Sequence, residues 1–404
     1  MRKPESQFFG RSDGQAPHKT FRSSVLVHCL PPLLPALTSS MKEINAENNH
    51  SGNVHPEGED NRGGIITKAI MLMKNKPINY YSVRFGYFVI LMIISSLLIY
   101  YFEREKNGGN YAYIDVLFLC ISAFTATGLS TISTFGFSPQ TFGVIGFLMF
   151  FGSIFFHVIP PLIARQYYNR KVLAQYKDRI EEIDPQVIEE HNKLNDALKL
   201  SIGVCISYLL SWQVLIFVVY YGALHLHPQE PELVERGYSR VQDAAFIVAS
   251  AFSNTGLTIS SSSVYYIANN PLAYCALMLA IVAGNTCIVP FLYFTFWSLL
   301  KIYDFFHWDA SAIRYIFQNP TKICQYTLSW EATRHIFLAM LAINVVEYTF
   351  FLPSAVYPSV TLAEYGSMAK VVGMLSFQTI STRTCGMQVM QTFTTIFLSL
   401  TRGK

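Results

Sequence analysis

Five apolar segments recur along this chain. The first four form two pairs, and each pair encloses a shorter stretch that is more polar and marked by glycine. The apolar segments cover residues 85–102, 142–164, 200–224, 272–300 and 336–351. A helix of about 20 apolar residues crosses a membrane, so each segment is predicted to span one. Breaks are expected at Pro160 and Pro161 in the second segment, and at Gly284 and Pro290 in the fourth.

The enclosed stretches repeat each other. The first reads Phe124-Thr-Ala-Thr-Gly-Leu-Ser-Thr-Ile-Ser133, and the second reads Phe252-Ser-Asn-Thr-Gly-Leu-Thr-Ile-Ser-Ser261. Eight residues recur 128 positions later: Asp115, Phe118, Ser122, Ala123, Phe124, Thr127, Gly128 and Leu129. A looser third copy covers residues 364–386, and its Gly386 follows Gly256 by 130 positions. A fixed-period match identifies the building unit, here span, loop and span.

Each enclosed stretch is predicted to be a re-entrant pore loop. Non-helical backbone at membrane depth is tolerated only where protein buries it or where it lines a water-filled path. A short helix is expected to start at Asp115 and at Asp243, because aspartate caps helix N-termini and suits their positive dipole end. The alternative is a Thr-Gly turn that only joins two helices, and two near-identical copies at fixed spacing argue against it.

Backbone carbonyls at the glycine are the candidate ion ligands, because glycine lets them turn without a Cβ penalty and carbonyls can replace the hydration shell of an ion. One loop cannot encircle an ion; about four are needed. The predicted filter residues are Thr127, Gly128, Thr255, Gly256, Cys385 and Gly386. For Cys385 the plainer alternative is a small packed side chain.

Two further residues are predicted to support the pore. Asn285 lies between Gly284 and Thr286, where its amide would hydrogen-bond backbone groups freed by a kink; direct ion contact is the alternative. Arg383 lies in the third loop, where it would brace the filter or tune cation entry. The favoured alternative pairs it with Glu347.

Composition places the chain in a membrane. Hydrophobic residues make up 51% of it and charged residues only 14%, against about 25% charged in soluble domains. The net charge of +4, without a basic stripe, gives no case for nucleic acid. The seven cysteines form no CxxC motif or zinc-ligand spacing. Without an enzyme motif such as HExxH or GxSxG, we expect neither an enzyme nor a cofactor.

The segments give a domain plan. Residues 1–64 are expected to form a disordered cytosolic leader, rich in Ser, Gly, Asn and Pro; a signal peptide at 25–37 and a start at Met41 are the alternatives for this region. The remaining divisions are a first repeat (65–168), a cytosolic connector (169–198), a second repeat (199–300), a second connector (301–332) and an incomplete third repeat (333–404).

Basic residues predict the orientation. Residues 165–199 hold seven lysines and arginines, whereas only two precede each of the first two loops. Because positive residues favour the cytosolic side, the N-terminus and the connectors are predicted to be cytosolic. The loops would then enter the membrane from outside.

These motifs resemble the Trk/Ktr/HKT superfamily of cation transporters, and most closely its eukaryotic HKT branch. The resemblance rests on the order of spans and loops, on both Thr-Gly copies, on Gly284-Asn-Thr286 and on Ser381-Thr-Arg-Thr-Cys-Gly386. It implies an all-α membrane protein in which four helix–pore loop–helix units surround one pseudo-fourfold pore, and a homodimer in the plasma membrane. It also implies permeant potassium or sodium, with Gly128 in the first loop favouring potassium.

The chain departs from that pattern after Gly386. The apolar stretch 389–400 has twelve residues, which is about 18 Å of helix against a hydrocarbon core of about 30 Å. We therefore expect a truncated chain, with the third unit incomplete and the fourth missing. Potassium transport, with sodium as the second candidate ion, is the leading hypothesis. The alternative is a non-conducting subunit that assembles with full-length relatives and modulates them; a two-pore-domain channel would leave the third loop unexplained.

Overall fold

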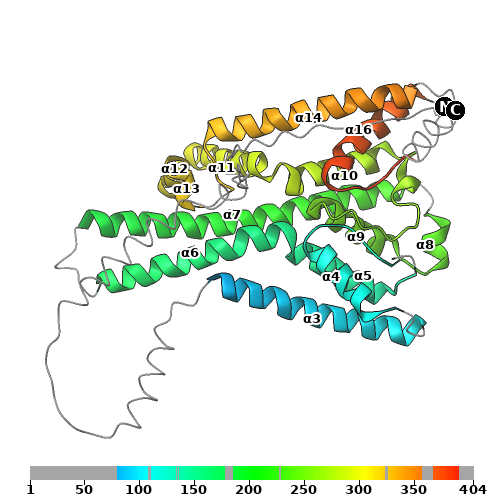
Figure 1. The fold of residues 1–404 in the computed structure, drawn as a ribbon. Coiled ribbons are helices and arrows are strands. Elements are labelled where there is room, and N and C mark those ends of the chain that lie inside the picture. Colours follow the sequence, from blue (N-terminus) through cyan, green and yellow to red (C-terminus); the bar gives the residue numbers. More distant parts are fainter. Residues whose placement is uncertain are drawn as a thin grey trace, which may run out of the picture. The chain divides into compact units, whose positions relative to one another are not determined.

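The computed structural model describes residues 80–107, 111–132, 134, 136–177, 185–226, 229–323, 326–356 and 367–390. They belong to one of two compact units of the chain, Pro77–Lys404. The predictions for the leader 1–64, and for residues 391–404 of the last apolar stretch, lie outside them. Every regular element of the described residues is helical (Figure 1), so the expectation of an all-α protein is confirmed.

Three helices of the described part are long and apolar enough to cross a membrane. They are α3 (Tyr80–Asn107), α7 (Pro185–Leu224) and α11 (Ile288–Phe305). Large apolar side chains of α3, such as Ile90 and Leu97, are exposed, as expected of a helix face in contact with lipid. The fifth predicted span lies within α14 (Trp330–Val356).

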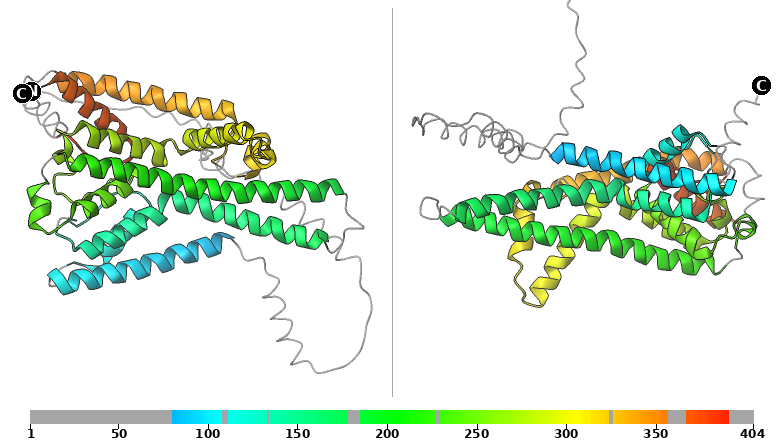
Figure 2. Two further views of the ribbon diagram at one scale, coloured as in Figure 1. Left: turned by 180° about the vertical axis from the view of Figure 1, so that it is seen from behind. Right: turned by 90° about the horizontal axis from the view of Figure 1, so that it is seen from below.

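Three shorter helices gather at the same end of these long helices (Figures 1 and 2). They are α4 (Tyr113–Phe124), α9 (Arg240–Ser253) and α16 (Met368–Thr384). Each packs on the long helix that precedes it in the chain: α4 on α3, α9 on α7 and α16 on α14. Each pair of a long and a short helix is linked to the next pair, because α5 packs on α9 and α10 packs on α16.

Both second spans are broken at a glycine. The first comprises α5 (Pro139–Phe151) and α6 (Ser153–Lys177), which meet at Gly152. The second comprises α10 (Pro271–Ile281), a π-turn (η2, Val282–Thr286) and α11. Gly152 and Gly284 have nearly the same non-helical dihedrals, φ −79°, ψ −143° and φ −76°, ψ −130°.

The break expected at Pro160 and Pro161 is therefore misplaced. α6 continues through both prolines, as membrane helices do when neighbouring groups take up the freed backbone carbonyls. The break expected at Gly284 is confirmed by its dihedrals. Pro290 lies in the first turn of α11, where its missing N–H costs no helical hydrogen bond.

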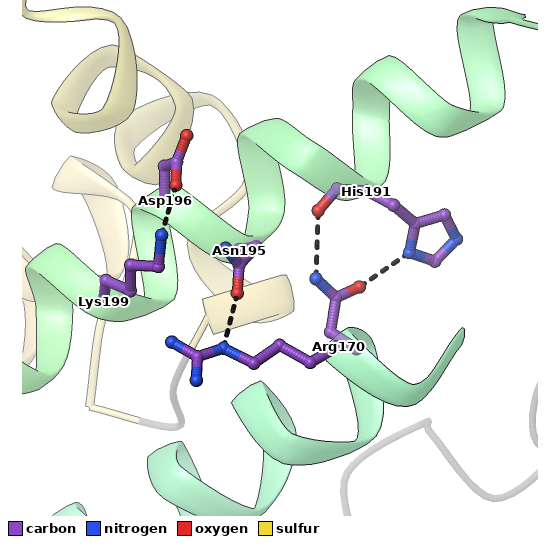
Figure 3. Close-up of polar contacts among 6 residues, drawn as sticks. Arg170, His191, Asn195, Asp196 and Lys199 are labelled. Atoms are coloured by element: carbon purple, nitrogen blue, oxygen red, sulfur yellow. Dashed lines mark hydrogen bonds and ion pairs between the residues drawn. The ribbon is translucent and has the colours of Figure 1, made fainter. Parts of the chain in front are cut away.

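Polar contacts join α6 to α7 beyond their apolar parts (Figure 3). Arg170 Nε donates to Asn195 Oδ1 at 3.4 Å, and Asn169 Nδ2 donates to the His191 carbonyl at 2.9 Å. The region predicted as a separate connector is thus largely the extension of two helices. Two short helices, α12 (Ser311–Gln318) and α13 (Pro320–Ile323), also pack on α7.

The segments that lead into the short helices are held by buried or capping polar groups. Glu103, 1% exposed at the end of α3, accepts from Ser138 N at 2.9 Å and Thr141 Oγ1 at 2.5 Å, and so holds the N-cap residue of α5, Ser138, in place. Between α7 and α9, the short helix α8 (Pro231–Glu235) carries Glu232, which accepts from the backbone N–H and the hydroxyl of Ser261. A 3-10 turn, η1 (Tyr265–Ile267), precedes α10.

Candidate functional site

The helices α4, α9 and α16 each end in a turn that contains a glycine in the left-handed conformation. We call these turn 1 (residues 125–128), turn 2 (253–256) and turn 3 (383–386). Their glycines, Gly128, Gly256 and Gly386, have φ of 73°, 79° and 79°. Glycine alone adopts this left-handed region without a steric penalty, so the sequence repeat is also a repeat of backbone geometry.

The first two turns are near copies, and the third is tighter. Thr127 N donates to Ser122 O, and Thr255 N donates to Ser250 O, both at 2.9 Å over five residues. In turn 3 the equivalent bond, from Cys385 N to Ser381 O at 2.9 Å, spans only four residues. Helix α16 therefore runs directly into its turn, without the left-handed residue that precedes the Thr-Gly pair in the other two.

The three turns contact one another in chain order through the backbone. A methyl carbon placed on Gly128 would lie 1.8 Å from the Thr255 carbonyl oxygen. One placed on Gly256 would lie 1.8 Å from the Cys385 carbonyl oxygen. Each glycine thus accommodates the carbonyl of the residue that precedes the glycine in the next turn.

This succession ends at turn 3. A methyl carbon on Gly386 meets nothing within 4 Å among the described residues. Thr127 and Gly386 are exposed, whereas Thr255 is 2% exposed. Turn 2 is therefore the middle of an arc, with turns 1 and 3 as its two ends.

The side chains of the turns are neutral in the first two cases and charged in the third. The Thr125 and Thr127 hydroxyls pair at 2.8 Å, and the Ser253 and Thr255 hydroxyls pair at 2.7 Å. Turn 3 has Arg383 and Cys385 at these positions. Cys385 is 5% exposed, in agreement with the plainer interpretation of a small packed residue.

The breaks in the second spans lie directly against the helices that carry the turns. A methyl carbon on Gly152 would be 2.1 Å from the Phe124 carbonyl oxygen, and one on Gly284 would be 1.9 Å from that of Phe252. Phe124 and Phe252 are corresponding residues of the repeat. Each break thus brings its span against the C-terminal end of a short helix.

Asp115 and Asp243 lie in the first turns of α4 and α9 but do not cap them. The helices begin earlier, with Ala112 and Ser239 as their caps, so the expectation of aspartate N-caps is wrong. Ser239 and Gln242 form a capping box, which satisfies the N–H groups that an aspartate would have taken.

The two aspartates differ in environment. Asp115 is half-buried and accepts from Thr131 Oγ1 at 2.7 Å. Asp243 is 3% exposed, and both of its carboxylate oxygens accept from Tyr266 Oη, at 3.0 and 2.9 Å. Their shared position near a helix N-terminus favours negative charge in both cases.

Asn285 does not make the hydrogen bonds expected of it. Its side chain is exposed and bonds to none of the described residues. The freed backbone groups are served from other helices: Tyr208 of α7 donates to the Ala283 carbonyl, and Asn254 of turn 2 bonds to Thr286. Polar side chains thus do bond at the break, but they belong to Tyr208 and Asn254, which are distant from it in sequence.

The expected pair between Arg383 and Glu347 is also not formed. Arg383 Nη2 donates to Met340 Sδ at 2.7 Å, while Arg383 Nη1 and Glu347 Oε2 are buried without a partner among the described residues. Arg383 lines a cavity of about 390 Å³ between the η2 turn, α14 and α16. Its charge therefore lies at the start of turn 3, and no carboxylate of the described residues forms an ion pair with it.

Sequence reasoning missed Gly152, Tyr208, Asn254 and Thr286. A signal was present for Gly152, because it precedes Gly284 by 132 residues, close to the repeat period. Asn254 was visible only as a difference between the copies, with Ala126 at the matching position. Tyr208 gave no signal, since a tyrosine in an apolar span is ordinary.

The chemistry available at the arc is that of neutral oxygen ligands. Backbone carbonyls and hydroxyls of turns 1 and 2 lie side by side, without a carboxylate in either turn. Such ligands suit weakly hydrated monovalent cations that must bind and leave quickly. The all-helical fold with apolar helices of membrane-crossing length thus defines a membrane protein with a candidate site for a permeant ion.

Comparison with known proteins gives the family. The family model described as a cation transport protein, TrkH, matches residues 180–396, more than half of the chain. The protein therefore belongs to the TrkH cation transport family, as its motifs indicated. The match includes turns 2 and 3 and the break at Gly284 between them, whereas turn 1 and Gly152 lie outside the matched residues.

Curated relatives agree with this assignment. The chain is 23% identical over 327 residues to the probable cation transporter HKT2;3 of Oryza sativa subsp. japonica, covering 75% of this chain and 62% of the relative. It is 23% identical over 194 residues to the high-affinity potassium transport protein of Saccharomyces cerevisiae, covering 48% and 16%. These relatives are named as transporters, not enzymes. The chain spans about 62% of the length of the rice relatives it matches.

Proposed function

We propose that this protein conducts potassium, with sodium as the second candidate ion, through a filter to which turns 1, 2 and 3 each contribute one wall. The filter ligands are the carbonyls around Thr127, Gly128, Thr255, Gly256, Cys385 and Gly386. The observation that carries the proposal is the repeated contact of one turn's glycine with the next turn's carbonyl. Such a succession places carbonyls of consecutive turns beside one another, as the neighbouring walls of one filter require.

The same geometry supports a plan of repeated units. Residues 65–168 and 199–300 each supply a first span, a short helix with its turn, and a second span, and the incomplete unit 333–404 supplies a first span and a short helix with its turn; 169–198 and 301–332 connect them on the cytosolic side. The open side of the arc, between Gly386 and Thr127, is where the fourth wall of a pseudo-fourfold pore would lie. A plasma-membrane dimer with cytosolic N-termini follows from the resemblance and from the basic residues of the connectors.

The short helices give the arc its preference for cations. Their C-terminal ends, which carry partial negative charge, all terminate at the turns. At the opposite ends of α4 and α9, Asp115 and Asp243 place a carboxyl group in the first helical turn, where negative charge is favourable. Together these dipoles would stabilise a positive ion at the arc without a formal negative charge in the first two turns.

Flux of potassium into liposomes tests the proposal. Purified full chain in liposomes should take up potassium faster than protein-free liposomes. Gly256→Ala should lower the rate, because its methyl collides with the Cys385 carbonyl. Gly203→Ala in α7, whose methyl meets nothing within 4 Å, should not. Uptake equal to that of protein-free liposomes would refute conduction by this chain.

The open side of the arc favours one alternative, a non-conducting subunit that modulates full-length relatives. The same liposomes distinguish it. Silence of this chain alone, combined with altered flux when it is reconstituted with a full-length relative, would support the alternative. Flux by this chain alone would exclude it.

A further inference from the structure

A chain of side-chain hydrogen bonds runs from turn 2, through the break between α10 and α11, to turn 3. Its members are Asn254 of turn 2, Thr286 of the break and Thr384 of turn 3. The Asn254 amide lies 2.7 Å from Thr286 Oγ1, and Thr286 Oγ1 lies 3.0 Å from Thr384 Oγ1. Three segments of the chain meet here, the outer two 130 residues apart in sequence.

The direction of these hydrogen bonds follows from the orientation of the Asn254 amide. We assign its oxygen toward Thr286, because only then do both ends of the amide find partners. Oδ1 then accepts from the hydroxyl of Thr286 at 2.7 Å and from its backbone N–H at 3.3 Å, and Nδ2 donates to the Ala251 carbonyl at 2.9 Å. Because the Thr286 hydroxyl donates its only proton to Asn254, the Thr384 hydroxyl is the donor to Thr286 Oγ1 at 3.0 Å, and it also lies 3.3 Å from the Asn254 oxygen.

The backbone N–H of Thr286 also faces the Asn254 amide. Gly284 departs from helical dihedrals, and the segment around it, Val282–Thr286, is a π-turn in place of regular α-helix. Asn254 takes up this N–H, and Tyr208 takes up the Ala283 carbonyl. Buried backbone groups without partners are costly. These two contacts therefore stabilise the broken form of the span relative to an unbroken helix.

We call the three hydrogen-bonded side chains of Asn254, Thr286 and Thr384 the clasp, and two of them directly precede residues whose carbonyls lie against a turn glycine. Asn254 precedes Thr255, whose carbonyl touches Gly128, and Thr384 precedes Cys385, whose carbonyl touches Gly256. A side-chain restraint on one residue limits the rotation of the following peptide unit. The clasp therefore restrains two consecutive carbonyls of the arc relative to each other.

Turn 1 has no such restraint. Its residue matching Asn254 is Ala126, which shares the left-handed conformation, with φ of 55° against 59°. The residue two positions after Gly152, where Thr286 follows Gly284, is Ile154. Neither can form a side-chain hydrogen bond, so the link is specific to turns 2 and 3 and is not a general feature of the repeat.

We propose that Asn254, Thr286 and Thr384 are positioning residues that set the ion preference of the filter, by holding the Thr255 and Cys385 carbonyls at a fixed separation. The inference rests on the proposed transport function. Without the clasp the carbonyls relax toward whichever ion is present, and a site that adapts to both ions discriminates poorly between them.

The first test compares Thr286→Val with Thr286→Ser and with a matched control. Valine removes the hydroxyl at constant shape, and serine restores it. Thr295→Val is the control, because the Thr295 hydroxyl donates only within α11, to Phe291 O at 2.8 Å. The measurement is the ratio of potassium to sodium flux in liposomes. Thr286→Val should lower the ratio about fivefold, the change given by one ordinary hydrogen bond, while Thr286→Ser and Thr295→Val should keep the wild-type ratio.

An unchanged ratio in Thr286→Val, with wild-type protein that conducts, overturns the inference and leaves the transport function intact. Wild-type protein without flux overturns the function instead. The clasp then stands on a measurement that needs no flux: the difference in unfolding temperature of the detergent-purified chain between potassium and sodium chloride. Thr286→Val should shrink that difference, because the ion that binds the folded chain more tightly stabilises it more. An undiminished difference refutes the inference.

A double-mutant cycle tests the hydrogen bond itself. Thr286→Val and Thr384→Val are measured singly and together by thermal unfolding of the purified chain. Because the two hydroxyls bond to each other, the double variant should lose less stability than the sum of the singles. Additive losses would show that the two hydroxyls act independently and would overturn the clasp.

Discussion

Substituting alanine at two glycines with the same backbone angle separates the two reasons for glycine in the turns. Gly256 and Gly386 both have φ of 79°, so alanine suffers the same left-handed strain at each, about 1–2 kcal/mol. Only at Gly256 does the new methyl also meet a neighbour, the Cys385 carbonyl oxygen at 1.8 Å. The comparison therefore isolates the close approach between turns 2 and 3.

The size of the extra effect follows from that distance. Carbon and oxygen do not approach closer than 3.0 Å, so one backbone must move by about 1.2 Å, the difference between 3.0 and 1.8 Å. Shifts of this kind in a packed interior cost about 1–3 kcal/mol. Gly256→Ala is thus expected to destabilise by about 2–5 kcal/mol, against about 1–2 kcal/mol for Gly386→Ala.

Thermal unfolding of the purified chain in detergent, at a fixed potassium concentration, measures this difference. Gly128→Ala should behave like Gly256→Ala, because its methyl would lie 1.8 Å from the Thr255 carbonyl oxygen. Equal unfolding temperatures for Gly256→Ala and Gly386→Ala would refute the reasoning. That result would mean that turns 2 and 3 do not touch as described.

Two further substitutions test the parts that position the turns, and both are measured by thermal unfolding. Gly284→Ala should destabilise by about 1–3 kcal/mol, because its methyl would lie 1.9 Å from the Phe252 carbonyl oxygen; Gly203→Ala, in open space within α7, should be neutral or slightly stabilising, and equal losses would contradict the contact. Glu103→Ala should cost about 1–3 kcal/mol by leaving the Ser138 N–H and the Thr141 hydroxyl without their buried acceptor, whereas exposed Glu105 should tolerate alanine; a neutral Glu103→Ala would show that these hydrogen bonds are dispensable.

The sequence alone determined the local features of this protein. Apolar runs of membrane-crossing length became helices because backbone groups in a membrane must be satisfied within the helix. The repeated Thr-Gly pairs became turns of one conformation because φ near 75° strongly favours glycine. The family followed from these same motifs. All of these properties depend on residues that are close together in the chain.

The tertiary structure decided which residues serve the breaks and the turns. Asn285, adjacent to the break, is exposed, while Asn254, 32 residues away, bonds to Thr286. Pro160 remains inside a helix, while Gly152 breaks its span, because the Phe124 carbonyl leaves no room for a side chain there.

The contact between Gly256 and the Cys385 carbonyl joins residues 129 positions apart. A local pattern specifies that a glycine turn forms, but not which carbonyl lies against it. That choice depends on how α5 packs on α9 and how α10 packs on α16, because the packing of these helices brings the turns together. The order of the arc is therefore a property of helix packing, whereas the turns themselves are properties of the sequence.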